Sequence, residues 1–110
     1  MAEGKIKCII KRPDELYGHV TNISASLENL QKTVGGYIEA VCIRKVEKDG
    51  REYEVVILCD EEGKLKHKMP NLALGRDIIC GDIIVLGSDG EDFCDLPITF
   101  QEWKDMRHWA

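Results

Sequence analysis

A short basic segment near the start of the chain carries the residue types that bind phosphate groups. Lys11 and Arg12 are followed by Tyr17 and His19 within one polar stretch. Lysine and arginine bind phosphate through charge-assisted hydrogen bonds, and a tyrosine ring can stack on a base. These residues predict a site for a phosphorylated, nucleotide-like ligand. An alternative stays open, in which Lys11 and Arg12 solvate a strand end and Tyr17 covers the core.

A helix start follows this segment at Ser24 and Ser26. The unpaired N–H groups and the dipole of a helix N-terminus favour an anion. We therefore expect the loop of residues 11–19 to lead into this helix, with both serines completing the site. Asn71, which lies between Pro70 and an apolar run, is the other candidate. Its amide either satisfies backbone groups across a bend or contacts a polar edge of the ligand.

No catalytic residue and no metal site are predicted. His19, His67 and His108 lack the spacing to cysteines or carboxylates that a zinc site requires. The three adjacent acids at residues 60–62 have oxygens that could bind a divalent cation, but the simpler role of an acidic turn is to be solvated. The sequence also lacks a phosphate-binding glycine loop and a dinucleotide fingerprint. An enzyme is therefore the least favoured class, and no cofactor is predicted.

The cysteines and the apolar segments indicate a cytoplasmic protein. The five cysteines are Cys8, Cys42, Cys59, Cys80 and Cys94. This odd number, with no Cys-x-x-Cys pair, predicts reduced thiols that pack as small apolar side chains, with at least four of them largely buried. The chain has neither an N-terminal secretory signal nor an apolar run of the ~20 residues that a membrane span needs. We expect a soluble protein of the cytoplasm.

Acidic residues dominate the last third of the chain. The net charge is −5, and residues 77–105 hold eight acids against Lys104 alone. An acidic face disfavours direct DNA binding, because binding to nucleic acid requires a basic surface. It predicts either a solvated surface or a surface that docks on a basic host protein or mimics nucleic acid.

The hydrophobic pattern predicts a single α+β domain over residues 1–110. Residues 5–12 read as a strand, residues 14–22 as a polar loop, and the segment from Ser26 to the Gly35-Gly36 pair as a helix. Residues 37–46 and 53–59 read as a hairpin around an Asp-Gly turn.

The second half of the chain completes the predicted sheet. Residues 64–68 are expected to pair as an edge segment, Pro70 and Asn71 to form a connector, and residues 82–86 to form a central strand. Residues 93–96 are expected to return antiparallel. A last helix begins at Thr99, with Glu102 at the reciprocal position of a capping box. The predicted architecture is a mixed, mostly antiparallel sheet with two short helices packed on it.

Four ordered segments carry a family resemblance. They are L-E-N-L-Q-K-T-V-G-G-Y-I-E at residues 27–39, C-D-E-E-G-K-L-K at 59–66, P-N-L-A-L at 70–74 and D-I-I-C-G-D-I-I-V-L-G at 77–87. The chain resembles the domain-of-unknown-function 3846 family, small proteins of phages, plasmids and bacteria. The resemblance implies a mobile-element setting and brings no reaction or cofactor. Two features depart from the family pattern: the hairpin at residues 44–53 is longer, and His67-Lys68 stands where the family often has glycine.

These observations favour a non-enzymatic accessory protein that acts by binding. The leading hypothesis is counter-defence, in which the protein sequesters a nucleotide-like signal through Lys11, Arg12 and Tyr17. The alternative is an inhibitor of a host protein that acts through the acidic face, and a small enzyme of unknown reaction is a third class. The sequence leaves open whether the chain forms a homo-oligomer.

Overall fold

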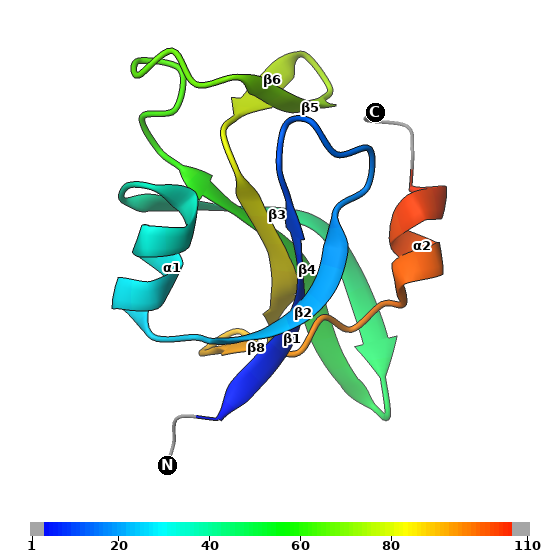
Figure 1. The fold of residues 1–110 in the computed structure, drawn as a ribbon. Coiled ribbons are helices and arrows are strands. Elements are labelled where there is room, and N and C mark those ends of the chain that lie inside the picture. The colour runs from blue at the N-terminus through cyan, green and yellow to red at the C-terminus, as the bar shows by residue number, and fades with distance from the viewer. Residues whose placement is uncertain (1–3, 107–110) are drawn as a thin grey trace.

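The computed structural model describes residues 4–106 and contains two antiparallel sheets and two helices (Figure 1). The larger sheet has the strand order β2-β1-β7-β4-β3, and β8 pairs with the end of β7. The smaller sheet is the hairpin β5–β6. The elements are β1 (Lys5–Lys11), β2 (His19–Ser24), α1 (Leu27–Val34), β3 (Ile38–Lys48), β4 (Arg51–Asp60), β5 (Pro70–Leu74), β6 (Asp77–Cys80), β7 (Ile83–Ser88), β8 (Phe93–Cys94) and α2 (Phe100–Asp105).

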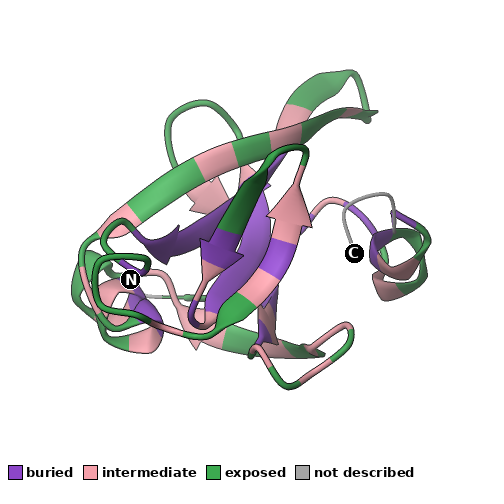
Figure 2. Cartoon of the chain, turned by 90° about the horizontal axis from the view of Figure 1, so that it is seen from above, coloured by how far each residue is buried: buried purple, intermediate pink, exposed green. Residues whose placement is uncertain are grey.

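Strand β7 lies at the centre of the sheet because it is apolar at every position from Ile83 to Leu86. All four of these side chains are buried. Ile83 and Val85 face one side of the sheet, whereas Ile84 and Leu86 face the other. A strand with no polar position is stable only when both of its faces are covered. The predicted central strand is confirmed, and Figure 2 shows that buried residues concentrate in the middle strands.

The two faces of the sheet carry separate cores. In the first core, Leu30 and Val34 of α1 pack against the sheet residues Cys8, Val56, Leu58, Ile84 and Leu86. In the second core, residues of the β5–β6 hairpin and of the α2 region pack on the other face of the larger sheet. The hairpin contributes Leu72 and Ile79, and the α2 region contributes Ile98, Trp103 and Met106. Ile9, Val55, Ile57 and Val85 are among the sheet residues. The prediction of an α+β domain with two short helices packed on a sheet is confirmed, and the helices lie on opposite faces (Figure 1). Neither helix within residues 4–106 is long and apolar enough to span a membrane.

Both helices begin at the predicted residues, and α1 also ends at the predicted glycine. The Ser26 side chain accepts a hydrogen bond from Asn29 N, and Gly35 ends α1 in the left-handed conformation with φ 83°. A non-glycine residue adopts that conformation at a cost, so the glycine stops the helix cleanly. In α2, the Thr99 side chain accepts from Glu102 N, and the Glu102 side chain accepts from Thr99 N. The predicted capping box is therefore confirmed.

The long β3–β4 hairpin forms around the predicted Asp-Gly turn. Asp49 and Gly50 both have positive φ, 54° and 77°, as a two-residue type I′ turn requires. The strands pair from Lys48 and Arg51 inward, with a bulge between Cys42 and Arg44. This hairpin forms one edge of the larger sheet.

Four predictions are wrong. Residues 14–22 are not one loop, because β2 begins at His19 and pairs with β1. Residues 64–68 form turns instead of an edge strand, and Pro70 and Asn71 begin β5 instead of a connector. Every strand pair within residues 4–106 is antiparallel, so the predicted sheet is not mixed there. The errors at residues 19–22 and 70–71 arise because polar residues and proline, which are also typical of loops, begin these strands.

Four of the five cysteines are largely buried, as predicted. Cys8 and Cys59 are buried, Cys80 and Cys94 are partly exposed, and Cys42 is exposed. Cys42 lies on the edge strand β3 beside the bulge and belongs to neither core.

Candidate functional site

Lys11 and Asn71 meet where the end of β1 approaches β5. Lys11 Nζ donates to Asn71 Oδ1 at 2.7 Å and to Asn71 O at 3.1 Å. In return, Asn71 Nδ2 donates at 2.8 Å to both Lys11 O and Gly81 O. The amide of Asn71 therefore joins β1, β5 and the start of β7, which is the bracing role considered for it.

The Lys11 ammonium is buried without a carboxylate partner. The residue is 5% exposed, and no carboxylate of residues 4–106 lies within 4.0 Å of its nitrogen. Burial lowers the pKa of Lys11, and the charges of Glu15 and Asp14 oppose this effect. Buried charges in proteins are normally paired, since desolvation is costly. Asn71 supplies two acceptors, so one of the three ammonium N–H groups is left for another acceptor.

Lys11 lines a cavity of about 200 Å³ between β5, α2 and the loop of residues 12–18, which we call the first loop. We call it the α2 cavity; its lining includes Lys11, Glu15, Tyr17, Asn71, Leu72, Trp103 and Lys104. Trp103 Nε1 donates to Tyr17 O at 2.8 Å, which ties the first loop to α2. Lys104 Nζ lies 5.9 Å from the centre of the Tyr17 ring. The cavity therefore combines an apolar wall with two ammonium groups and one carboxylate.

Arg12 and His19 do not line this cavity. The Arg12 side chain is 64% exposed, and its Nε lies 4.0 Å from Asp82. His19 Nδ1 lies 3.4 Å from Glu15 Oε2, and Glu15 Oε1 accepts a hydrogen bond from Arg12 N. The hydrogen bond from the Arg12 backbone is the main cause that lowers the pKa of Glu15. These contacts order the first loop on its solvent side.

Ser24 and Ser26 lie at the opposite end of the β1–β2 pair. Ser24 pairs with Lys5, whereas His19 pairs with Ile10. At about 3.4 Å per residue, the helix start is about 17 Å from the first loop. Both serines are used locally: Ser24 Oγ accepts from Ser26 N, and Ser26 Oγ accepts from Asn29 N. The expectation that the first loop leads directly into this helix is wrong, because β2 separates them.

The acids of residues 77–105 are spread over the molecule. Asp77 pairs with Lys64 beside the β5–β6 hairpin, and Asp82 pairs with Arg12. Asp89 lies in the turn before β8, where its side chain accepts from Glu91 N and Asp92 N. The β5–β6 hairpin and β8 lie at opposite ends of the molecule (Figure 1). These acids therefore do not form the single acidic face that the sequence suggested.

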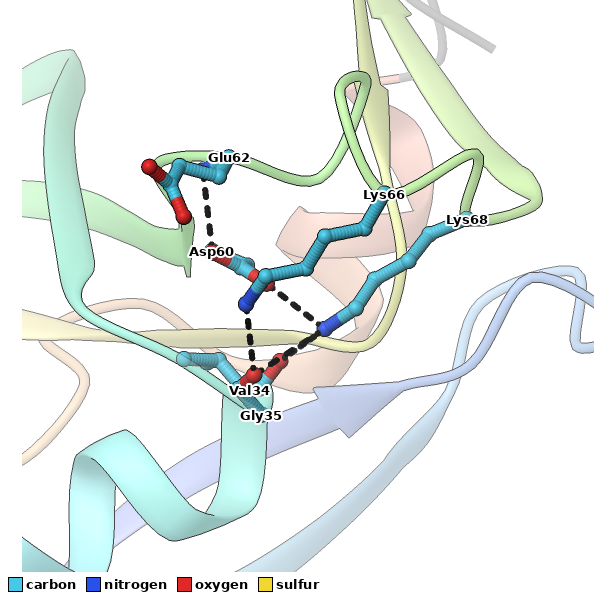
Figure 3. Close-up of polar contacts among 6 residues, drawn as sticks. All are labelled: Val34, Gly35, Asp60, Glu62, Lys66 and Lys68. Atoms are coloured by element: carbon cyan, nitrogen blue, oxygen red, sulfur yellow. Dashed lines mark hydrogen bonds and ion pairs between the residues drawn. The ribbon is translucent and has the colours of Figure 1, made fainter.

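A second charged cluster forms around Asp60, whose side chain is 1% exposed (Figure 3). Lys66 and Lys68 each form an ion pair with Asp60 Oδ2, at 2.8 Å and 2.7 Å. The same ammonium groups donate to Gly35 O and Val34 O at the end of α1. Asp60 Oδ1 accepts from Glu62 N. We call these contacts of Asp60, Lys66 and Lys68 with the end of α1 the Asp60 latch. The latch holds residues 61–69 against α1, and its polar groups are satisfied within the chain.

The acidic turn contains no cation site. Asp60 is committed to the latch, and no three His, Cys, Asp or Glu side chains within residues 4–106 are grouped to hold a metal ion. His108 lies outside the described residues. His67 has φ 59°, a conformation that favours glycine, which explains why a glycine suits this position.

The sequence pattern did not identify Leu72, Trp103 and Lys104 as neighbours of Lys11. Leu72 and Trp103 are apolar residues whose type indicates only burial, and Lys104 carried no signal beyond its charge. Lys11 and Asn71 are 60 residues apart, and Tyr17 and Trp103 are 86 apart. Only the folded chain brings Lys11, Tyr17 and Asn71 of the predicted set together. Whether they bind a ligand stays a prediction.

Several residues of the segments that carry the resemblance support this architecture. Asp60 and Lys66 form the latch, and Asn71 joins Lys11 to Gly81. No curated protein and no solved structure matches the chain. A family model described as a domain of unknown function (DUF3846) matches residues 6–108, nearly the whole length, and the chain therefore belongs to this family.

Proposed function

We propose that this chain is a non-enzymatic binding protein that holds the anionic end of a nucleotide-like ligand in the α2 cavity. One observation carries the proposal: the buried Lys11 ammonium has no carboxylate partner among the described residues and lines a cavity. An anionic oxygen within hydrogen-bond reach of Lys11 would supply the missing counter-charge. Asn71 holds the Lys11 side chain in place, so little entropy is lost when the ligand arrives.

The cavity also indicates the size of the bound group. Ligand pockets usually have volumes of about 300–1,000 Å³, so a cavity of about 200 Å³ accepts one ring or one phosphorylated sugar rather than a whole dinucleotide. Tyr17 and Lys104 lie along the wall, where they would contact the rest of the ligand. The ligand is therefore held by one end, and its remainder lies in solvent.

In the mobile-element setting that the family resemblance implies, such binding serves counter-defence by sequestering a nucleotide-like immune signal. Sequestration needs only tight binding, and no catalytic group has to be supplied. The structure gives the acidic-face alternative less support, because the acids of residues 77–105 lie on separate elements. Arg12, which also belonged to the predicted site, is left outside it.

The proposal is tested by mass spectrometry followed by calorimetry. Protein purified from infected cells is denatured, and the released small molecules are identified; an intact phosphorylated compound is expected. Calorimetry then uses AMP and GMP as probes, with adenosine as the uncharged control. Loss of a charge-assisted hydrogen bond costs about 1.5–3 kcal/mol, so Lys11→Met should weaken AMP binding about ten- to a hundred-fold.

Arg12→Met is the matched control, because it removes a cation that lies outside the cavity. It should change AMP affinity by less than about two-fold. Lys104→Met gives a second test if Lys11→Met does not fold. Equal affinity for AMP and adenosine, or an Arg12→Met effect as large as that of Lys11→Met, contradicts the proposal. Conversion of AMP to a product by catalytic amounts of protein would show an enzyme instead.

A further inference from the structure

The Lys11 side chain is held in a way that also suits a nucleophilic amine. Asn71 accepts two of its N–H groups, at Oδ1 and at the backbone oxygen, and no other hydrogen bond or ion pair of residues 4–106 uses Lys11 Nζ. A neutral amine has two N–H groups, so it satisfies both acceptors as well as an ammonium does. The third position on the nitrogen then carries a lone pair instead of a proton.

The surroundings of Lys11 favour the loss of that proton. The residue is buried, and the cavity that it lines has an apolar wall that includes Leu72 and Trp103. Burial lowers the pKa of Lys11, although the charges of Glu15 and Asp14 oppose this effect. Lysines that are desolvated in apolar pockets act as nucleophiles and form imines with carbonyl compounds. Binding of an anion and loss of a proton are therefore two ways to relieve the same unpaired charge.

Glu15 supplies the acid–base group that imine formation needs. It is the one carboxylate among the described residues that line the α2 cavity. Its two oxygens contact Arg12 N and His19 Nδ1, and these contacts hold the carboxylate in place. Imine formation requires one proton to leave the amine and one to reach the departing oxygen. Glu15 can take the first proton and return it as the second.

Lys104 provides a place for an anionic group on the same ligand. Its Nζ lies 5.9 Å from the centre of the Tyr17 ring and 5.2 Å from the centre of the Phe100 ring. No carboxylate of residues 4–106 lies within 4.0 Å of this nitrogen. The two rings hold the cation, and its N–H groups are left for a phosphate or carboxylate oxygen of a ligand. The cavity of about 200 Å³ is smaller than most ligand pockets, so a ligand inside it has only a few carbon atoms.

We infer that Lys11 forms a reversible imine with a small aldehyde that carries an anionic group, and that Lys104 binds this group. Glu15 takes a proton from the Lys11 ammonium, and the exposed lone pair forms a C–N bond to the aldehyde carbon. Glu15 then returns the proton to the hydroxyl group of the carbinolamine, the C–O bond breaks and water leaves. The product is a protonated imine, which keeps the positive charge and one N–H group for Asn71. The aldehyde is captured without turnover.

Reductive trapping tests this inference on the full chain. Glyceraldehyde 3-phosphate is the probe, glyceraldehyde is the uncharged control, and cyanoborohydride converts an imine into a stable secondary amine. Peptide mass spectrometry then measures the labelling rate of each lysine in the wild-type protein, so no variant of Lys11 has to fold. The probe should label Lys11 at least about ten-fold faster than it labels the exposed Lys32 and Lys48.

Two pairs of variants test the other groups. Lys104→Met should slow the labelling of Lys11 by the probe about ten-fold and leave labelling by glyceraldehyde unchanged. Lys32→Met is its matched control, because Lys32 is an exposed lysine of α1, on the other face of the sheet. Glu15→Gln should slow labelling by both aldehydes at least about ten-fold. Asp14→Asn also removes a negative charge that acts on Lys11, and it should not slow labelling.

Labelling of Lys11 that is no faster than that of the exposed lysines overturns the inference. Equal effects of Lys104→Met and Lys32→Met, or of Glu15→Gln and Asp14→Asn, also overturn it. The inference uses the α2 cavity as a ligand site, as the proposed function does, but it requires no nucleotide. AMP binding in calorimetry without selective labelling overturns this inference alone. Selective labelling of Lys11 without AMP binding supports it and contradicts the proposed function.

Discussion

Replacement of Asp60 by asparagine should destabilise the fold, because it removes the only anion in the described Asp60 latch. The buried carboxylate accepts from Lys66, Lys68 and the backbone of Glu62. An asparagine side chain could keep the backbone contact, but it would leave two ammonium groups side by side without a counter-charge. Residues 61–69 would then lose their fastening to the end of α1 (Figure 3).

The pKa of Asp60 gives the magnitude. Burial by itself raises this pKa, but the hydrogen bonds from Lys66 and Lys68 outweigh it, and the result is lowered from 3.8 to about 2. One pKa unit corresponds to about 1.4 kcal/mol, so a lowering of nearly two units means that the charged carboxylate contributes about 2 kcal/mol to the free energy of unfolding. Asp60→Asn should therefore lower the unfolding temperature by about 10 °C at pH 7.

The pH dependence follows from the direction of the change. A carboxyl group whose pKa is lowered on folding contributes stability above its unfolded pKa and loses it as the pH falls through the folded value. Wild-type protein should lose this contribution between about pH 4 and pH 2. The difference in free energy between wild type and Asp60→Asn should shrink over the same interval.

Urea denaturation at a series of pH values measures both effects. Asp77→Asn is the matched control: Asp77 also pairs with a lysine, Lys64, but both side chains are exposed and solvent screens the pair. It should change stability much less than Asp60→Asn does. Equal effects of the two substitutions, or an Asp60→Asn effect that stays constant down to pH 2, would refute the reasoning.

Three further outcomes are expected. Thr99→Ala should lower the free energy of unfolding by about 1 kcal/mol, because Thr99 caps α2. Trp103→Ala should lower it by about 3–5 kcal/mol, because Trp103 is a buried core side chain. Unchanged urea midpoints would contradict both expectations. His67→Gly should raise stability by about 0.5–1 kcal/mol, since it relieves the positive φ, and a lower unfolding temperature would show that the side chain contributes more than the backbone strain costs. A thiol reagent should label exposed Cys42 rapidly and Cys8 only on unfolding, because Cys8 is buried and its pKa is raised to about 11; similar rates would exclude the observed burial.

Elements with strong local signals were predictable from the sequence. The capping box at Thr99, the glycine that ends α1 and the Asp-Gly turn each depend on residues within a few positions of one another. The central strand β7 was predictable because four consecutive apolar residues require cover on both faces. In each case the local preference and the tertiary environment agree.

Elements without a distinctive local pattern, and contacts between distant segments, were not predictable. Strand β2 is polar and half-exposed, and only pairing with β1 makes it a strand. Pro70 and Asn71 resemble a turn, yet they begin β5, in which Pro70 pairs with Cys80 of β6 and Asn71 lies at a register shift. The α2 cavity joins segments 60 and 86 residues apart, and no spacing in the sequence encodes that distance. Lys11 and Tyr17 were identified by residue type, but their neighbours were not.

Stability measurements distinguish a bracing role of Lys11 from the proposed binding role. If its only role is to brace Asn71, Lys11→Met should lower the stability of the ligand-free protein, because it leaves buried acceptors of Asn71 unsatisfied, at about 1–3 kcal/mol each. If its main role is to hold an anion, the unpaired charge already costs stability in the ligand-free state, and its removal offsets the lost hydrogen bonds. Stability then changes by less than about 1 kcal/mol, while the stabilisation that AMP gives to the wild type disappears. The size of the change without ligand, together with the AMP response, distinguishes a structural lysine from a binding one.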